Sequence, residues 1–91
     1  MIKALSINDM DNVIVAIEPI TRGEVIKYKD KKNNIKEIEV LEDIVIYHKI
    51  AVADINQNEV VIKYGEHIGK AIVDIRKGTH VHIHNTISEK N

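Results

Sequence analysis

One eight-residue pattern occurs three times in the chain, as PITRGEVI at residues 19–26, DINQNEVV at 54–61 and DIRKGTHV at 74–81. Each copy has Pro or Asp, then Ile, two polar residues, Gly or Asn, two further residues and an aliphatic one. DIVIYHKI at 43–50 is a weaker fourth copy. We interpret each copy as a one-turn helical connector. Its Ile packs into the core, and its Gly or Asn takes the left-handed conformation that turns the chain into the next strand.

The apolar composition predicts that these connectors join strands. The chain has 18 Ile and 10 Val against 2 Leu and 5 Ala, and β-branched side chains favour sheets over helices. Turn residues separate about eight short apolar runs of strand length, and the charged segment 27–36 reads as an exposed hairpin tip. The runs are 2–7, 13–17, 24–28, 35–40, 49–52, 59–63, 68–72 and 81–84. We predict a mostly β protein in which residues 1–91 form a single domain.

Size and charge exclude several classes of function. A chain of 91 residues leaves little apolar material to enclose a deep pocket, so we expect any active site to be completed by another chain. The net charge of −1 and the three aromatic residues argue against nucleic-acid binding. The absence of cysteine excludes disulfides and thiolate metal sites. Without a membrane span or a signal-peptide pattern, we expect a cytoplasmic protein that binds no membrane.

The sequence THVHIHN at residues 79–85 carries three of the five histidines. On a strand, alternation would place the imidazoles of His80, His82 and His84 on one face and the apolar side chains between them on the other. Alternate residues lie about 6.6 Å apart, and the first and third about 13 Å apart. A metal needs each imidazole nitrogen within roughly 2.1 Å. A neighbouring pair could therefore hold one ion, which leaves the third imidazole to bind a carboxylate or move a proton.

The two remaining histidines differ in their surroundings. His48 opens a predicted strand and can point to the same end of the molecule, so the sequence leaves it open between a site residue and a surface residue. His67 lies in a predicted loop, where an exposed histidine with no special role is expected. Neither serine of the chain has the context of a nucleophile elbow, which excludes a serine hydrolase.

YGEHIGKA at residues 64–71, Asp74-Ile75 and GTHVHIHN at 78–85 resemble the end of the SAF domain of the altronate and galactarate dehydratase family. Residues 1–11 and 54–64 fit the same pattern, so the resemblance covers nearly the whole chain. It implies a β-clip fold. In that family the domain is the N-terminal part of a long enzyme or, as the length here suggests, a separate small subunit beside a large catalytic chain.

The resemblance also implies a reaction and roles for particular residues. Family enzymes remove water from a hexonate or hexarate and form a 2-keto-3-deoxy acid with the help of a divalent metal, Fe²⁺ or Mn²⁺. The metal and the sugar-acid substrate would be shared with a large dehydratase subunit. We expect His80, His82 and His84 to be catalytic and His48 and Asn85 to bind substrate, and we assign metal ligation to His82 with His84.

Three residues depart from the family pattern, and other functions stay open. The family usually has Gly at Tyr47, Pro at His67 and an acidic residue at Thr79. The change at Tyr47 could alter the turn that presents His48. One alternative is the small subunit of the related sulfolactate sulfo-lyase, and another is a non-catalytic SAF binding module. We also expect that the isolated chain could form a homo-oligomer.

Overall fold

The four copies of the repeated pattern associate in two pairs in the computed structural model, which describes residues 2–88. Ile20 and Ile44 exchange backbone hydrogen bonds of 3.0 and 2.8 Å, and Ile55 and Ile75 exchange two of 2.7 Å. All four isoleucines are buried, as predicted. The predicted helical turn is wrong, because residues 2–88 contain no helix. The backbone groups of each isoleucine bond to the paired connector instead of closing a helical turn.

Each connector ends in the left-handed conformation, as predicted. The φ angle is 90° at Gly23, 69° at Tyr47, 74° at Asn58 and 90° at Gly78. The weaker copy at 43–50 therefore has the same backbone as the other three, although a tyrosine stands at the turning position.

Carboxylates at the start of the connectors tie the pairs together. Three bonds of 2.8 Å join a backbone N–H of one copy to the Oδ1 of the other: Arg22 to Asp43, Gln57 to Asp74 and Lys77 to Asp54. In the first pair, Pro19 stands where the fourth carboxylate would be. The Asp that begins the pattern thus caps the turn of the partner copy.

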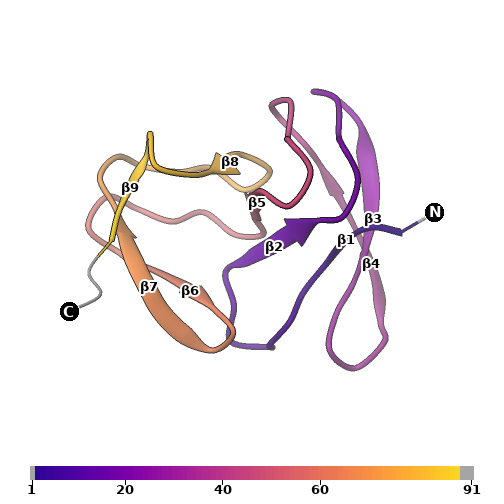
Figure 1. The fold of residues 1–91 in the computed structure, drawn as a ribbon, viewed down its shortest axis with the longest axis horizontal. Helices are drawn as coiled ribbons and strands as arrows, with labels where there is room; N and C mark the ends of the chain where they lie inside the picture. Colours follow the sequence, from indigo (N-terminus) through magenta and orange to yellow (C-terminus); the bar gives the residue numbers. More distant parts are fainter. Residues whose placement is uncertain (1, 89–91) are drawn as a thin grey trace.

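Between the connectors run nine short strands in the described part of the chain (Figure 1). They are β1 (Ile2–Leu5), β2 (Val13–Ala16), β3 (Val25–Lys29), β4 (Ile35–Glu39), β5 (Lys49–Ala51), β6 (Val60–Lys63), β7 (Glu66–Ala71), β8 (His80–Val81) and β9 (Thr86–Ile87). One sheet has the order β4-β3-β1-β2-β5-β8 and the other β6-β7-β9. The predicted hairpin tip lies between β3 and β4, and β9 is the strand that the sequence did not predict. No helix in residues 2–88 could cross a membrane.

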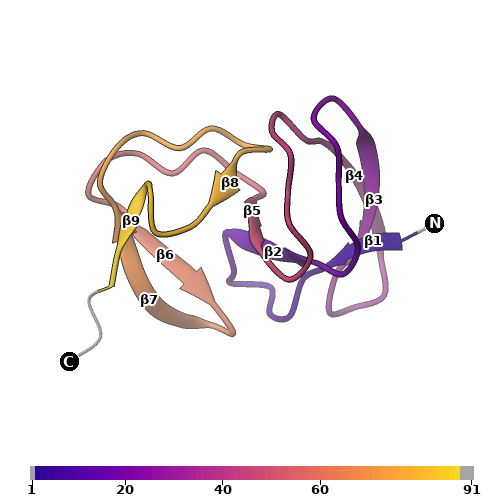
Figure 2. The same ribbon diagram turned by 45° about the horizontal axis from the view of Figure 1, so that its top comes forward.

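The core consists of two apolar clusters, one for each half of the molecule. The first contains Ala4, Ile14, Ala16, Ile20, Ile26, Ile38, Val40, Ile44 and Ile50. The second contains Val13, Ala51, Ile55, Val61, Ala71, Ile75 and Val81. In both views β5 and β8 lie between the β3–β4 hairpin and the β6-β7-β9 sheet (Figures 1 and 2). Residues on β5 and β8 are therefore placed where the two halves meet.

Candidate functional site

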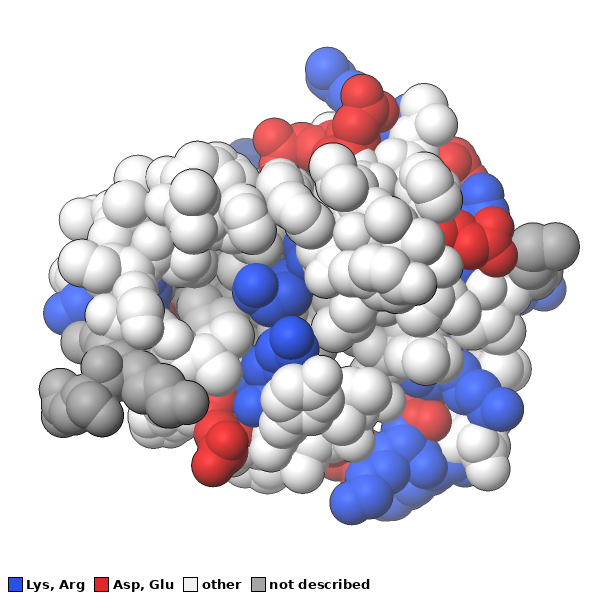
Figure 3. All heavy atoms as spheres, viewed as in Figure 1, with Lys and Arg blue, Asp and Glu red and all other residues white. Residues whose placement is uncertain are grey.

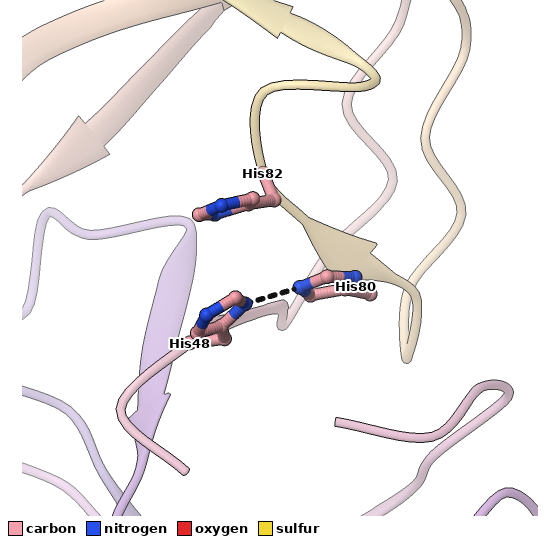
Figure 4. A group of neighbouring side chains, drawn as sticks. All are labelled: His48, His80 and His82. Atoms are coloured by element: carbon pink, nitrogen blue, oxygen red, sulfur yellow. Dashed lines mark hydrogen bonds between the residues drawn. The ribbon is translucent and has the colours of Figure 1, made fainter. Parts of the chain in front are cut away.

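The antiparallel pairing of β5 with β8 brings two distant segments together. In this register Ile50 lies opposite His80. His48 directly precedes β5 and follows Tyr47, whose left-handed backbone turns the chain into the strand. As a result, Nδ1 of His48 and Nε2 of His80 lie 2.8 Å apart and share a hydrogen bond (Figure 4).

After Val81 the chain forms a turn instead of continuing the predicted strand. The backbone N–H groups of Asn85 and Thr86 both donate to the carbonyl of His82, each at 3.1 Å. The predicted alternation is therefore wrong beyond β8. Val81 is buried, whereas Ile83 is 81% exposed and does not share its face.

The side chain of Asn85 holds this turn in place. Asn85 is only 4% exposed. Its Nδ2 donates to the carbonyl of His80 at 2.7 Å, and its Oδ1 accepts the backbone N–H of His82 at 3.0 Å. Substrate binding by Asn85 stays a prediction. In this structure its amide positions the backbone of two histidines.

The turn gathers four imidazoles into one cluster. The ring centroids of His48 and His82 are 4.2 Å apart, those of His48 and His80 5.0 Å, and those of His80 and His82 5.5 Å, all stacked (Figure 4). The exposed ring of His84 lies 5.2 Å from that of His80. The separation of about 13 Å expected for a strand does not occur, because the chain turns back. The cluster includes His48, which the sequence left open.

The imidazoles disfavour one another's protonation. Burial, and next the charge of His48, lowers the pKa of His80, and the same two causes lower the pKa of His82. Glu42 accepts the backbone N–H of His80 at 3.0 Å and raises the pKa of that imidazole, but the lowering effects are larger. The bond between His48 and His80 also needs one neutral ring, because two imidazolium rings would point N–H groups at each other. Neutral imidazole is the form that accepts a proton or ligates a metal.

Lys49 adds a cation to the site, and the sequence reasoning missed it. Burial, and next the charge of Lys63, lowers the pKa of its ammonium group. Lys49 also contributes to the lowered pKa of His82, so it lies near the cluster. Figure 3 shows basic side chains gathered between the two halves of the molecule. The sequence did contain a signal for it, because Lys49 directly follows the candidate residue His48 and begins the apolar run 49–52.

The cavity nearest to the cluster in the described part of the chain adjoins Lys49 and not the imidazoles. This cavity of about 140 Å³ lies beside the cluster at Lys49, where Ile83 and Thr86 also line it, but none of the four clustered histidines does. Small-molecule sites usually enclose roughly 300 Å³ or more, so this cavity cannot surround a sugar acid. Completion of the active site by another chain stays a prediction.

Three of the histidines could hold a metal ion together. One ring nitrogen each from His48, His80 and His82 lies within 4.8 Å of the other two. The predicted metal pair of His82 with His84 stays a prediction, and the ring positions favour this different group. His67 lies on β7 and not in the predicted loop, but it is exposed, as expected.

Residues 2–89 match the family described as altronate/galactarate dehydratase SAF domain. The chain belongs to this family. It is 40% identical over 82 residues to altronate dehydratase from Bacillus subtilis (strain 168), covering 90% of this chain and 16% of that protein. It is 37% identical over 82 residues to altronate dehydratase from Escherichia coli (strain K12), with the same shares of 90% and 16%. The match to (2R)-sulfolactate sulfo-lyase subunit alpha from Chromohalobacter salexigens is 32% identical over 87 residues.

The relatives differ in how much of their length this SAF domain represents. The chain spans 16% of the two altronate dehydratases but 93% of the sulfo-lyase subunit, with 92% of its own residues in that match. The family match confirms the resemblance seen at residues 64–71 and 78–85, and the all-β architecture confirms the predicted fold class. The single domain over 1–91 stays a prediction, and residues 1 and 89–91 lie outside the described part.

Proposed function

We propose that the chain is the small subunit of a two-chain, cytoplasmic sugar-acid hydro-lyase whose active site is completed by a large dehydratase subunit. The observation that carries the proposal is the open imidazole cluster beside Lys49. The adjoining cavity at Lys49 has a volume of only about 140 Å³ and no histidine lines it, so a second chain would have to supply the walls of a substrate site at the cluster. The 93% coverage of a sulfo-lyase subunit alpha supports a separate small subunit.

The cluster suits the removal of water from a hexonate or hexarate. A base takes the proton next to the carboxylate, and the electron pair of that C–H bond forms the enediolate. Loss of the neighbouring hydroxyl, protonated as it leaves, gives water and an enol that becomes the 2-keto-3-deoxy acid. The ammonium of Lys49 would stabilise the charge that develops on the carboxylate. A divalent cation at the site would supply Lewis-acid stabilisation of the same charge.

The histidines divide between accepting and donating protons. In the metal-free cluster the hydrogen-bonded pair of His48 and His80 keeps a neutral ring available as the base. His82 stacks on His48 and lies close enough to Lys49 to sense its charge, so it would contact the carboxylate end of the substrate. His84 is exposed at the edge of the cluster, where it would protonate the leaving hydroxyl. Asn85 acts on substrate through His80 and His82 in this scheme, as a positioning residue.

A sulfo-lyase is the second candidate, favoured by the near full-length match to a sulfolactate sulfo-lyase subunit alpha. The same base and cationic groups would serve, but the leaving group would be sulfite. Sulfite is a weak base and leaves without a proton donor. A sulfo-lyase would therefore depend much less on His84 than a hydro-lyase would.

The test is reconstitution with a large partner. The chain would be co-expressed with a protein from the same genome that matches the remainder of altronate dehydratase. Altronate, galactarate and (2R)-sulfolactate would then be assayed. We expect no turnover by the chain alone, turnover of a sugar acid by the complex, and a loss of about 100-fold or more on His82→Ala without loss of association. His67→Ala is the matched control.

Three outcomes would reject the proposal or change it. Turnover by the isolated chain would remove the need for a partner. Full activity of the His82→Ala complex would remove the cluster from the chemistry. A complex that assembles but turns over none of the three acids would favour the non-catalytic binding module.

A further inference from the structure

The strongest unassigned feature of the molecule is the convergence of three imidazoles from two connectors. His48 stands at the entrance to β5, His80 on β8 and His82 directly after β8. Their ligand nitrogens lie within 4.8 Å of one another, and all three side chains are partly buried. His84, although it contacts His80, lies outside this group.

We propose that His48, His80 and His82 together form a binding site for one divalent first-row metal ion. The ion would be of intermediate softness, such as Fe²⁺, Co²⁺ or Zn²⁺, because imidazole is the ligand that these ions share. The existence of the site stands on its own geometry. Its role in polarising a substrate oxygen rests on the proposed function. In that metal-bound form the three imidazoles are ligands, so the large subunit would supply the base.

The distances fit a three-nitrogen site. With a metal–nitrogen bond of about 2.1 Å, two ligand nitrogens on one ion lie about 3.0 to 3.4 Å apart, depending on the coordination geometry. Nδ1 of His48 and Nε2 of His80 already lie 2.8 Å apart. The third nitrogen, from His82, lies within 4.8 Å of both. Rotation of the rings would bring all three to ligating distance, and the shared hydrogen bond would give way to two bonds to the ion.

The ring planes define what must move. The three rings stack with interplanar angles of 11° to 22°, whereas an ion lies in the plane of each imidazole that ligates it. The rings must therefore turn about the bond from Cβ to the ring, a torsion whose energy profile is broad in histidine. The backbone need not move, since the pairing of Ile50 with His80 and the side chain of Asn85 fix where the ligands start.

The donor set predicts an open site. Three neutral imidazoles satisfy three positions, and no carboxylate or thiolate belongs to the described group. Structural zinc sites have four protein ligands, whereas catalytic sites keep a position for water or substrate. A substrate carboxylate or hydroxyl, or a ligand from a partner chain, would fill the open positions. The nearby carboxylate of Glu42 adds negative charge that favours a bound cation.

Direct metal titration of the 91-residue chain tests the site without substrate or partner. Co²⁺ would be followed by visible absorption and Zn²⁺ by calorimetry at neutral pH. We expect one ion per chain and a loss of affinity of about 10-fold or more in each of His48→Ala, His80→Ala and His82→Ala. His84→Ala and His67→Ala should bind like the wild type.

NMR signals and metal binding distinguish a missing metal site from failure of the proposed function and from misfolding of a variant. In the wild-type chain, histidine NMR signals of the three ligands should shift with one equivalent of Zn²⁺ while those of His67 do not, which needs no variant to fold. Absence of saturable binding, or equal binding by all five variants, would overturn the site. Binding at the trio in a chain whose complex with a large subunit proves inactive would leave the site standing and reject the lyase.

Discussion

Two kinds of connector build this molecule, and they share a backbone but differ at one side chain. In all four copies the N–H of the sixth residue donates to the carbonyl of the third, at 2.9 to 3.1 Å. In the copies at 19–26 and 54–61 the sixth residue is a glutamate whose carboxylate accepts the N–H of the third residue, at 2.7 and 2.6 Å. In the copies at 43–50 and 74–81 it is His48 and Thr79.

The connectors without the glutamate are the ones that position the candidate functional residues. Each pair of connectors contains one copy that keeps the glutamate and one that lacks it. The two copies that lack it are the ones that lead into β5 and β8, whose pairing assembles the histidines. The repeated backbone bond and the bridging isoleucine keep the turn intact without the glutamate, so the sixth position can be His48 in one copy and Thr79 in the other.

The largest expected effect compares glycines with the same φ in the two kinds of connector. Both Gly23 and Gly78 have φ of 90°. A Cβ at Gly78 would overlap the backbone carbonyl of Glu39, whereas at Gly23 it meets no atom within 4 Å. Gly78→Ala should lower the free energy of unfolding by about 3 to 5 kcal/mol and Gly23→Ala by about 1 to 2 kcal/mol. Urea denaturation measures both, and equal losses would show that backbone strain alone matters.

Asn85→Ala should have the next largest effect. It leaves the carbonyl of His80 and the N–H of His82 without their partner in a buried turn, at a cost of about 2 kcal/mol. Broadened or shifted NMR signals of His80 and His82 should accompany the loss. Asn34→Ala, which removes only an exposed bond of 3.3 Å from Nδ2 of Asn34 to Oδ2 of Asp30, is the control and should change stability by about 0.5 kcal/mol or less. An unchanged stability of Asn85→Ala would mean that the turn forms without its cap.

Tyr47→Gly should stabilise the chain without weakening function, because glycine adopts the left-handed turn that precedes His48 without strain. Tyrosine in the left-handed conformation is strained, and three equivalent positions use Gly or Asn, so relief of strain should add about 0.5 to 1 kcal/mol. Tyr64, also left-handed with φ of 58°, supplies the matched variant Tyr64→Gly. Thermal unfolding measures the gain. Neither variant should lower the activity of the complex, and a loss confined to Tyr47→Gly would show that the tyrosine side chain itself positions His48.

The smallest expected effect is a dependence of stability on pH. Burial and the charge of His48 lower the pKa values of His80 and His82 in the folded chain, while the unfolded values lie near 6.5. Below about 6.5 the unfolded chain therefore binds more protons, so stability should fall as the pH drops through the folded pKa values. NMR titration of the histidines measures the pKa values directly. A variant with both residues changed to Asn should lose this part of the pH dependence, and folded values above 6.5 would contradict the account.

Much of the fold could be predicted because its signals are local. Repetition of the connector pattern predicted the buried isoleucines and the left-handed turns at Gly23, Asn58 and Gly78. The helical turn was predicted wrongly because spacing alone does not say whether a backbone bonds within its own turn or to a partner copy. Which copies pair with one another is a long-range property, and no residue pattern within one connector specifies it.

The site could be predicted in part for the same reason. The three C-terminal histidines were visible as a motif. Their alternation was predicted too far along the chain, because the side chain of Asn85 ends the strand through bonds to the backbone of His80 and His82. Such local bonding by asparagine is a known competitor of regular structure, so that signal was present. The inclusion of His48 depends on the register of β5 with β8, which the sequence does not reveal.

The most direct test of the central claim, that residues from two connectors act as one site, is a double-mutant cycle on the reconstituted complex. We would measure kcat/KM for the wild type, His48→Ala, His80→Ala and the double variant. If the two rings work as a unit, the double variant should be hardly worse than the more damaged single variant. If the losses of kcat/KM in the two single variants instead multiply in the double variant, the two rings contribute independently and the claim is contradicted.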